Sequence, residues 1–497
     1  MRKFLYSLLA VVIVVILVLP FLVGRLVSSE FKAQVAAMHY KSVRVKLLSF
    51  HSGWFSSSAR IEIDRRVPGV LKRLFKDQMP QRFVYRGTLK IAHGPVAMAS
   101  NLKNHRELVW GRGVITGNLK LMMPQASVFS RFQGLNEVTR VFGVVGLNGV
   151  THLTFAHPGL KYMNAEQGEL VTFGKIRSHV TLGATSSLIK GSTRLASLKI
   201  SSKTWQVATS PIRIDFQFTP KSGNQWAGKQ VVTIQQILFG HAGKTRATLT
   251  DFQLKASNHL VDGFANLSQM ITIGQLAGGH FYFDHFKMQI GVKHFNMAAR
   301  AKLLQLVRNK QYKALPEAVR KQKTMHWLVE LLKGSSYQLK TLQVHSSVGL
   351  LQADGSLQFA KTLPSNDKIQ DPVMRLAHAS TAALNVSLPY LAPQAKATPL
   401  VTMPGPVVPK GSASVPSKDA ETTMLTTLIH AAYQKGYVVK QGDRLVAHMK
   451  YQLGKAYLNN QLLPFVLPSK AKPPVKQQAA PAALAQPIAP KDEQSAP

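Results

Sequence analysis

Apolar and polar residues alternate with a period of two over most of the chain beyond residue 43. Val43, Val45 and Leu47 alternate with Arg44 and Lys46, which is the pattern of a half-buried strand. Similar segments follow up to residue 292, separated by Gly, Asn, Ser or Pro and without intervening helical periodicity, so the pattern predicts an antiparallel meander rather than a parallel sheet. The other expected strands are 55–64, 83–91, 113–122, 149–155, 178–182, 192–201, 212–219, 231–239, 246–256, 280–292, 337–345, 349–359, 379–388, 437–440, 444–451 and 455–458.

Strong helical periodicity occurs in residues 295–333. Apolar residues such as Ala299, Leu303 and Val307 recur there at spacings of three and four. Pro316 suits the first turn of a second helix, and Gly334 suits its end. The expected fold class is therefore α+β and mainly antiparallel β, with one N-terminal transmembrane helix and a long β-meander body that contains an inserted helical pair.

The first segment of the chain predicts a membrane anchor. Residues 4–24 carry no charge and follow Arg2 and Lys3. About 20 apolar residues span a bilayer, and preceding positive charges keep the N-terminus in the cytoplasm. We expect a single-pass inner-membrane protein whose bulk is periplasmic, or else a signal peptide cleaved near Ser29. The predicted anchor positions are Phe4, Leu8, Val12, Ile16 and Leu19.

Composition divides the chain into five regions. Residues 1–29 form the cytoplasmic end and anchor, and residues 30–390 form the β-rich periplasmic body. Residues 391–419 are rich in Pro, Ala, Ser and Lys, as linkers are. Residues 420–466 predict a small helix and hairpins that pack on the body, and residues 467–497 predict a disordered tail.

Several short motifs resemble one family of proteins. Residues 50–57 (FHSGWFSS) resemble the aromatic–x–x–Gly–x–Phe–x–Ser signature of YdgA-like bacterial envelope proteins, whose function is unknown. Residues 93–95 (HGP) are similar to the family's His-Gly-Pro turn, and residues 331–334 and 451–459 follow in the family's order. Asn460 stands where the family tends to have Gly. The resemblance implies an N-terminal anchor and a β-rich periplasmic body, and it transfers no catalytic residues.

The charge balance narrows the choice of partners. The 497 residues include 62 Lys and Arg but only 22 Asp and Glu, and no Cys. A charged content of 17% is low against a typical value of about 25%, and acids account for the deficit. The basic residues are spread along the chain, which disfavours nucleic acid as a partner and favours anionic lipid headgroups or an envelope protein. Because Asp and Glu lose their charge in acid, we also hypothesise an acid-living bacterial source.

Nucleotide-binding motifs are absent in their full form. Gly243-Lys244-Thr245 ends like a phosphate loop, but Leu238 stands where that motif needs its first glycine, and a strand follows. Gly111, Gly113 and Gly117 miss the dinucleotide spacing by one residue. The sequence therefore predicts no cofactor.

Two polar clusters are candidates for a metal site and a catalytic site. His280, Asp284, His285 and His294 form the densest histidine cluster. His280 and Asp284 would share a strand face while His285 points to the other, so a metal site would require a bulge. Glu62 and Asp64 share a face at a spacing that glycosidases use. The neighbouring Arg65 and Arg66 favour a salt-bridge cluster instead.

The turn at His93, Gly94 and Pro95 is the position most suited to a specific role. Gly94 permits an unusual backbone angle, Pro95 restricts the next one, and the His93 side chain can lock the turn. We expect a structural corner or a binding contact here, and similarly at Gly53, Trp54 and Phe55.

The sequence thus favours a non-enzymatic, membrane-anchored periplasmic protein that organises the envelope or binds a lipid or protein. The alternative is a lipid-transfer-type carrier, which would need a continuous apolar groove. An envelope hydrolase is a third, weaker hypothesis, since no catalytic motif is present.

Overall fold

The computed structural model describes most of the chain between residues 29 and 466. The described residues are 29, 31–33, 35, 43–66, 82–94, 96–100, 106–122, 132–133, 137–164, 168–183, 188–221, 225–241, 244–278, 281–346, 349–365, 369, 371–389, 427 and 429–466.

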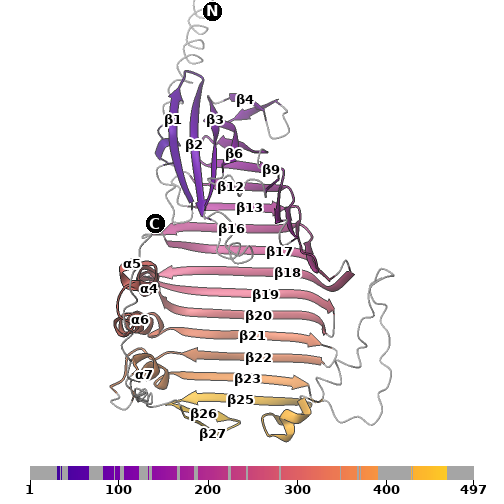
Figure 1. Cartoon of the computed structure of the whole chain (residues 1–497), viewed down its shortest axis with the longest axis vertical. Coiled ribbons are helices and arrows are strands. Elements are labelled where there is room, and N and C mark those ends of the chain that lie inside the picture. The colour runs from indigo at the N-terminus through magenta and orange to yellow at the C-terminus, as the bar shows by residue number, and fades with distance from the viewer. Residues whose placement is uncertain are drawn as a thin grey trace, which may run out of the picture.

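A single antiparallel sheet runs the length of the molecule (Figure 1). Most strands pair with the strand before and the strand after them, so the sheet is a meander. Its main ladder contains β1 (Val43–Ser52), β2 (Ser56–Arg66), β3 (Arg82–His93), β6 (Gly113–Met122), β8 (Val138–Val145), β9 (Thr151–His157), β12 (Ile176–Leu182), β13 (Ile189–Leu195), β16 (Ile212–Lys221), β17 (Gln225–His241), β18 (Lys244–Val261), β19 (Phe264–Gly278), β20 (Phe281–Asn296), β21 (Ser336–Ser346), β22 (Gly349–Gln358), β23 (Thr381–Pro389), β25 (Arg444–Gln452), β26 (Lys455–Leu458) and β27 (Gln461–Val466).

A shorter side ladder joins the main ladder on β17. Its strands are β7 (Phe132–Gln133), β10 (Leu160–Asn164), β11 (Glu169–Phe173), β14 (Leu198–Ser201) and β15 (Trp205–Thr209). The first part of β17 pairs with β16 and its last part pairs with β15, so the two ladders diverge from one long strand. Two further short elements are β24 (Val439–Gln441), which pairs with β25, and a separate hairpin of β4 (Val96–Ser100) and β5 (Arg106–Trp110).

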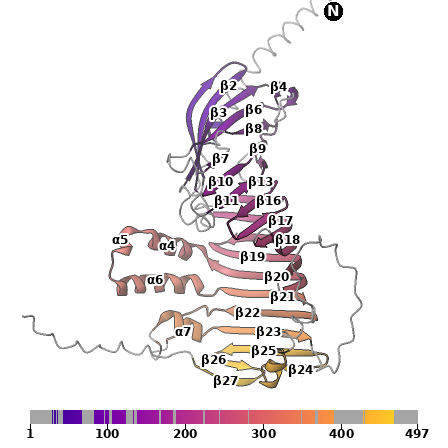
Figure 2. The ribbon, with the colours of Figure 1, turned by 45° about the vertical axis from the view of Figure 1, so that its right-hand side comes forward.

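Helices project from one edge of the sheet (Figure 2). They are α4 (Met297–Arg308), α5 (Lys310–Lys313), α6 (Glu317–Leu332) and α7 (Pro372–His378). Asn296 caps α4, because its Oδ1 accepts a hydrogen bond from the Ala299 amide at 3.0 Å. Asp371 caps α7 in the same way through the Val373 and Met374 amides.

The prediction of a mainly antiparallel β fold with few helices is confirmed, and the helical pair expected at 295–333 corresponds to α4 and α6. Nine strands were not predicted, namely β4, β5, β7, β8, β10, β11, β15, β19 and β27, and neither was helix α7. The segment 192–201 was expected to be one strand, but it is two, because the chain passes from the main ladder to the side ladder at Ala196 and Ser197. The C-terminal segment continues the sheet, since β25 pairs with β23 along its length.

Within the described residues, no helix is long and apolar enough to span a bilayer. The predicted anchor at residues 4–24, the linker at 391–419 and the tail at 467–497 lie outside the described residues.

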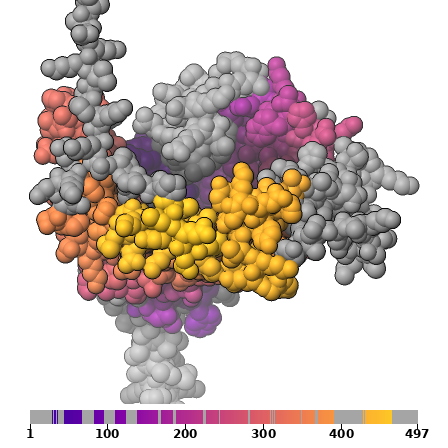
Figure 3. All heavy atoms as spheres, turned by 90° about the horizontal axis from the view of Figure 1, so that it is seen from below, coloured from indigo at the N-terminus to yellow at the C-terminus, as the bar shows by residue number. Residues whose placement is uncertain are grey.

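The best-buried part of the sheet is its N-terminal end. Ala59, Ile61, Leu89, Ile91 and residues of β6 and β8 form one core cluster. The side ladder contributes to a second cluster through Tyr162 and Val171, which contact Leu121. The sheet twists along its length; seen from its C-terminal end, the C-terminal strands (yellow) cross the front, and residues from the middle of the chain (magenta and pink) are visible beyond them at the upper right and below (Figure 3).

Candidate functional site

The pairing register places one residue of each of seventeen strands in a single, mostly apolar row. Residues directly opposite each other on neighbouring strands lie on the same face of a sheet, so the register alone defines this row. No member is charged, and only Ser178 and Thr193 are polar. The row is Phe50, Ala59, Leu89, Gly117, Val141, Phe155, Ser178, Thr193, Ile214, Val232, Leu254, Ile271, Met288, Leu342, Ala353, Val386 and Ala447.

The adjacent row, one residue along each strand, points to the opposite side. It is polar throughout except for Ala156 and Val446, and it carries six basic residues. We call these two sides the apolar face and the polar face. The polar row is Ser49, Arg60, Thr88, Asn118, Arg140, Ala156, Arg177, Arg194, Arg213, Thr233, Gln253, Thr272, Lys287, Gln343, Gln352, Ser387 and Val446.

Burial of the apolar face changes along the sheet. Ala59, Leu89 and Val141 are buried in the N-terminal core, whereas the members of the row on β16 to β21 are only partly buried. On the same face, Leu267, Ile290 and Met449 are between 36% and 43% exposed. At a strand spacing near 4.8 Å the row extends for about 75 Å. Among the described residues, the face is therefore a long apolar surface that is buried at its N-terminal end and only partly buried from β16 to β21.

Four large apolar side chains are exposed along one edge of the N-terminal strands. Backbone hydrogen bonds connect consecutive turns on this edge, from His93 N to Phe55 O at 2.8 Å, and from Arg112 N to Val145 O at 2.7 Å. The exposed residues, with exposed fractions between 50% and 73%, are Trp54, Phe55, Trp110 and Leu147. We call them the aromatic edge.

The aromatic edge lies close to the chain that leads from the predicted anchor. The rings of Phe31 and Phe50 are 6.1 Å apart, and Lys32 Nζ lies 4.8 Å from the centre of the Phe50 ring. Phe50 belongs to β1, just before the hairpin turn that carries Trp54 and Phe55. Gly53 donates its amide hydrogen to Ser56 O at 2.9 Å in this turn.

The His93 turn belongs to the same edge. Gly94 has a φ of 127°, a conformation that favours glycine. His93 is 4% exposed, and its Nε2 lies 2.8 Å from Ser57 Oγ. Burial lowers the pKa of His93, so the ring is neutral at pH 7. Pro95 lies outside the described residues.

The candidate carboxylates Glu62 and Asp64 form ion pairs with basic side chains. Glu62 Oε2 accepts from Arg86 Nε at 2.7 Å, Lys46 Nζ lies 3.4 Å from Glu62 Oε1, and Asp64 pairs with Arg82. These partners lie on the neighbouring strands β1 and β3 instead of at Arg65 and Arg66. Arg86 is the main cause of the lowered pKa of Glu62.

The remaining motifs fall in ordinary strand pairs. β20 has a register shift between Phe283 and Phe286, and His285 has a φ of 74°. Nevertheless, the described residues contain no group of three His, Asp or Glu side chains that could hold a metal ion; His280 itself lies outside them. His241 pairs with Lys244, so the phosphate-loop-like segment connects two antiparallel strands.

The sequence pattern predicted most strands of the main ladder but not the apolar row as a site. The missing information was the register, which decides whether the apolar sides of successive strands coincide. The exposure of Trp110 was also not predicted, although its position before Gly111 and Gly113 indicates a turn.

Comparison with known proteins identifies a family without adding an activity. No curated protein matches the chain, and no solved structure matches it. One family model, described as "Bacterial protein of unknown function (DUF945)", matches residues 1–465. The chain therefore belongs to the DUF945 family of bacterial proteins.

Proposed function

We propose that this protein is anchored in the inner membrane and binds the acyl chains of lipids along the apolar face of its periplasmic sheet. The observation that carries the proposal is the uncharged row across seventeen strands. A protein that only organises the envelope needs a filled core and a local contact patch. A carrier of acyl chains needs a continuous apolar surface, which this register provides.

The accessible part of the apolar face supports the same proposal. From β18 to β23, each strand contacts its neighbours in the sheet, and the helix contacts described there are those of α4 with β19 and α6 with β20. Antiparallel sheets usually cover their apolar side with another layer. Here Met288, Leu342 and Val386 are only partly buried. Hydrocarbon chains fit such a surface because apolar contact requires no directional partner.

The position of the aromatic edge suggests where lipid enters. Trp residues favour the interface between membrane and water, and Trp54 lies on the hairpin beside the Phe31–Phe50 contact. The row begins at Phe50 and leads away from that end. About 75 Å of apolar row is several times the half-thickness of a bilayer's hydrocarbon core, about 15 Å. Lipids would therefore lie one after another along the face.

Photo-crosslinking tests the proposal directly in cells. A benzophenone amino acid replaces Met288 on the apolar face or, as a matched control, Lys287 on the polar face of the same strand. We expect lipid adducts on the purified full-length chain at 288 and at least about tenfold fewer at 287. Equal labelling at both positions, or a protein adduct alone at 288, would contradict acyl-chain binding. The second result would favour an envelope protein as the partner.

A charge on the apolar face provides an independent check. Ile271→Glu should remove most of the co-purifying lipid, because a carboxylate in the row opposes contact with acyl chains. Thr272→Glu adds the same charge on the polar face and should leave the lipid content unchanged. The thermal stability of both variants is measured on the full-length protein in a neutral detergent. Their lipid contents are compared only if the two stabilities are equal.

A further inference from the structure

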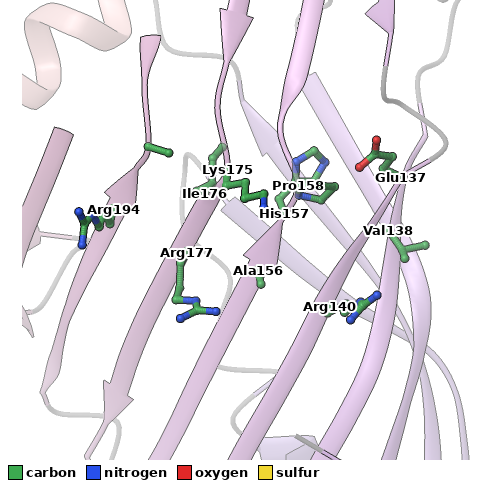
Figure 4. Close-up of a pocket in the computed structure, with 11 residues that line it drawn as sticks. Glu137, Val138, Arg140, Ala156, His157, Pro158, Lys175, Ile176, Arg177 and Arg194 are labelled. Atoms are coloured by element: carbon green, nitrogen blue, oxygen red, sulfur yellow. The ribbon is translucent and has the colours of Figure 1, made fainter. Parts of the chain in front are cut away.

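A cavity of about 550 Å³ lies where the side ladder leaves the main ladder (Figure 4). Near the cavity the chain passes between the two ladders four times. It leaves the main ladder at the ends of β9 and β13 and returns to it at the starts of β12 and β16. Ala196 N donates to Lys175 O at 2.8 Å across this junction. Most of the lining side chains belong to the polar face, so the cavity is separate from the apolar row.

Cations dominate the lining of this cavity. Arg140, Lys175, Arg177 and Arg194 contribute to it, and Glu137 is the one carboxylate among its described lining residues. Arg177 is directly opposite Arg194, and Arg194 is directly opposite Arg213. Like charges in directly opposed positions destabilise a sheet.

Carboxylates of the protein neutralise only part of this charge. Arg213, outside the cavity, is paired with Asp215 at 2.8 Å. In contrast, no described carboxylate lies within 4.0 Å of the charged groups of Lys175, Arg177 or Arg194. The cavity lining therefore has four basic side chains against one carboxylate, Glu137, and three of these basic side chains form no ion pair with a described carboxylate.

The other lining residues leave room and supply a neutral donor. Ala156 occupies the place between Arg140 and Arg177 in the polar row, and its small side chain leaves space between the two guanidinium groups. His157 Nδ1 accepts from the Gly159 amide at 3.1 Å. Burial is the main cause of the lowered pKa of His157, so the ring is neutral and carries its hydrogen on Nε2.

We propose that this cavity binds a phosphate group, as an ester or a free anion, between Arg177, Arg194 and Lys175. Guanidinium groups bind phosphate oxygens in bidentate pairs, which a single ammonium group cannot do. The negative charge of a phosphate group also offsets the repulsion between the opposed arginines. This site does not depend on acyl-chain binding, since it lies on the other face of the sheet.

The first experiment uses inorganic phosphate and the full-length protein in a neutral detergent. Titration calorimetry compares the native chain with Arg177→Gln, Arg194→Gln and the control Arg213→Gln, which removes the same charge from the same row outside the cavity. We expect the first two variants to weaken binding at least about tenfold and Arg213→Gln to change it less than about twofold. Equal losses in all three would show general charge attraction and overturn the site.

The second experiment identifies the source of the phosphate. Vesicles of phosphatidylglycerol and phosphatidylcholine are compared with vesicles of phosphatidylcholine alone in flotation. Arg177-dependent flotation with the anionic vesicles indicates a lipid headgroup, whereas binding of inorganic phosphate alone indicates a soluble phosphate compound. Either outcome supports the site, and binding of neither probe overturns it.

Arg177→Lys keeps the positive charge but cannot bind phosphate in a bidentate pair. Its affinity for phosphate should therefore be lower than that of the native chain, and it replaces the Gln variants in the comparison if those fold poorly. Ile271→Glu should bind phosphate normally, which separates this proposal from acyl-chain binding.

Discussion

At the scale of single residues, the buried polar side chains His93 and Glu62 make the stability of this sheet depend on pH. His93 is the clearest example, because it is nearly fully buried, contacts Ser57 through Nε2, and has no partner for Nδ1 among the described residues. A buried neutral histidine opposes protonation, whereas the same residue in the unfolded chain takes up a proton near pH 6.5.

The lowered pKa of His93 predicts a loss of stability in mild acid. Below about pH 6.5 the unfolded chain binds more protons than the folded chain, so the free energy of unfolding falls as pH decreases toward the folded pKa. His93→Gln should reduce that slope between pH 7.5 and pH 5.5 in thermal unfolding. His259→Gln, at an exposed position, serves as control. An unchanged slope in His93→Gln would contradict this origin.

Glu62 predicts a further loss of stability, of the same sign as that of His93 but at lower pH. Its pKa lies below 4.5, mainly because of the hydrogen bond from Arg86. Its stabilising contribution is therefore complete above pH 4.5 and disappears as pH falls through the folded pKa. Glu62→Gln should be less stable than the native protein at pH 7, and the difference should shrink below pH 4.5. Asp215→Asn, which removes an exposed ion pair, should change little.

Gly94 tests the structural role of the His93 turn. Gly94→Val should lower the free energy of unfolding by about 1–3 kcal/mol, because a β-branched side chain is strained at a φ of 127°. Gly291→Ala is the control, since a Cβ there would lie 3.4 Å from the flexible Lys340 side chain. Chemical denaturation measures both. Unchanged stability with lost lipid binding would instead assign the turn to binding.

At the scale of elements, turns on one edge of the sheet have a different chemistry from the strands between them. The aromatic edge exposes Trp54 and Trp110 to solvent, although exposed tryptophan is costly in water. An environment that is partly apolar would remove this cost. The turns of β1–β2 and β5–β6 therefore suit contact with the membrane interface.

This contact predicts selective quenching of tryptophan fluorescence. In the full-length protein reconstituted in vesicles, brominated lipids should quench Trp54 and Trp110 more than Trp205, which is also exposed but belongs to the side ladder. Variants with Phe at one position each assign the signal. Equal quenching of Trp205 would contradict a membrane contact specific to this edge.

At the scale of the whole molecule, one long sheet replaces the several globular domains that 497 residues would allow. Each strand contacts chiefly its neighbours, as in repeat proteins, so length is added without a larger core. Such an architecture holds a continuous surface over a distance that a compact domain of similar size does not reach.

We propose that the predicted anchor holds this sheet at the membrane. The protein should remain in the membrane fraction after carbonate washing, and a reporter that is active only outside the cytoplasm should be active after Pro497. A soluble product shorter by about 29 residues would show cleavage of a signal peptide and contradict the anchor.

The scarcity of acids supports the hypothesis of an acidic periplasm only in part. With 22 acids in the chain, unfolding between pH 5 and pH 2 should depend little on carboxylates. Glu62 and Asp64 are exceptions because they form ion pairs across β1, β2 and β3. A large loss of stability in the native protein that is absent in Glu62→Gln would trace the change to this cluster.

The sequence alone determined the antiparallel β class, the helical pair and the turn at Gly94, because alternation, periodicity and glycine act locally. Val43, Val45 and Leu47 identify a strand without reference to any other part of the chain. Local pattern could not separate β13 from β14, since residues 192–201 suit one continuous strand and only the side ladder divides them.

Tertiary structure decided the sites. The apolar row exists because sixteen successive pairings keep Phe50 through Ala447 on one face, and a shift of one residue in any pair would send the following residues to the other side. In the same way, Arg177, Arg194 and Lys175 are unremarkable surface residues in the sequence and meet only where the two ladders diverge. Register and divergence depend on contacts between distant segments, and no local pattern contains them.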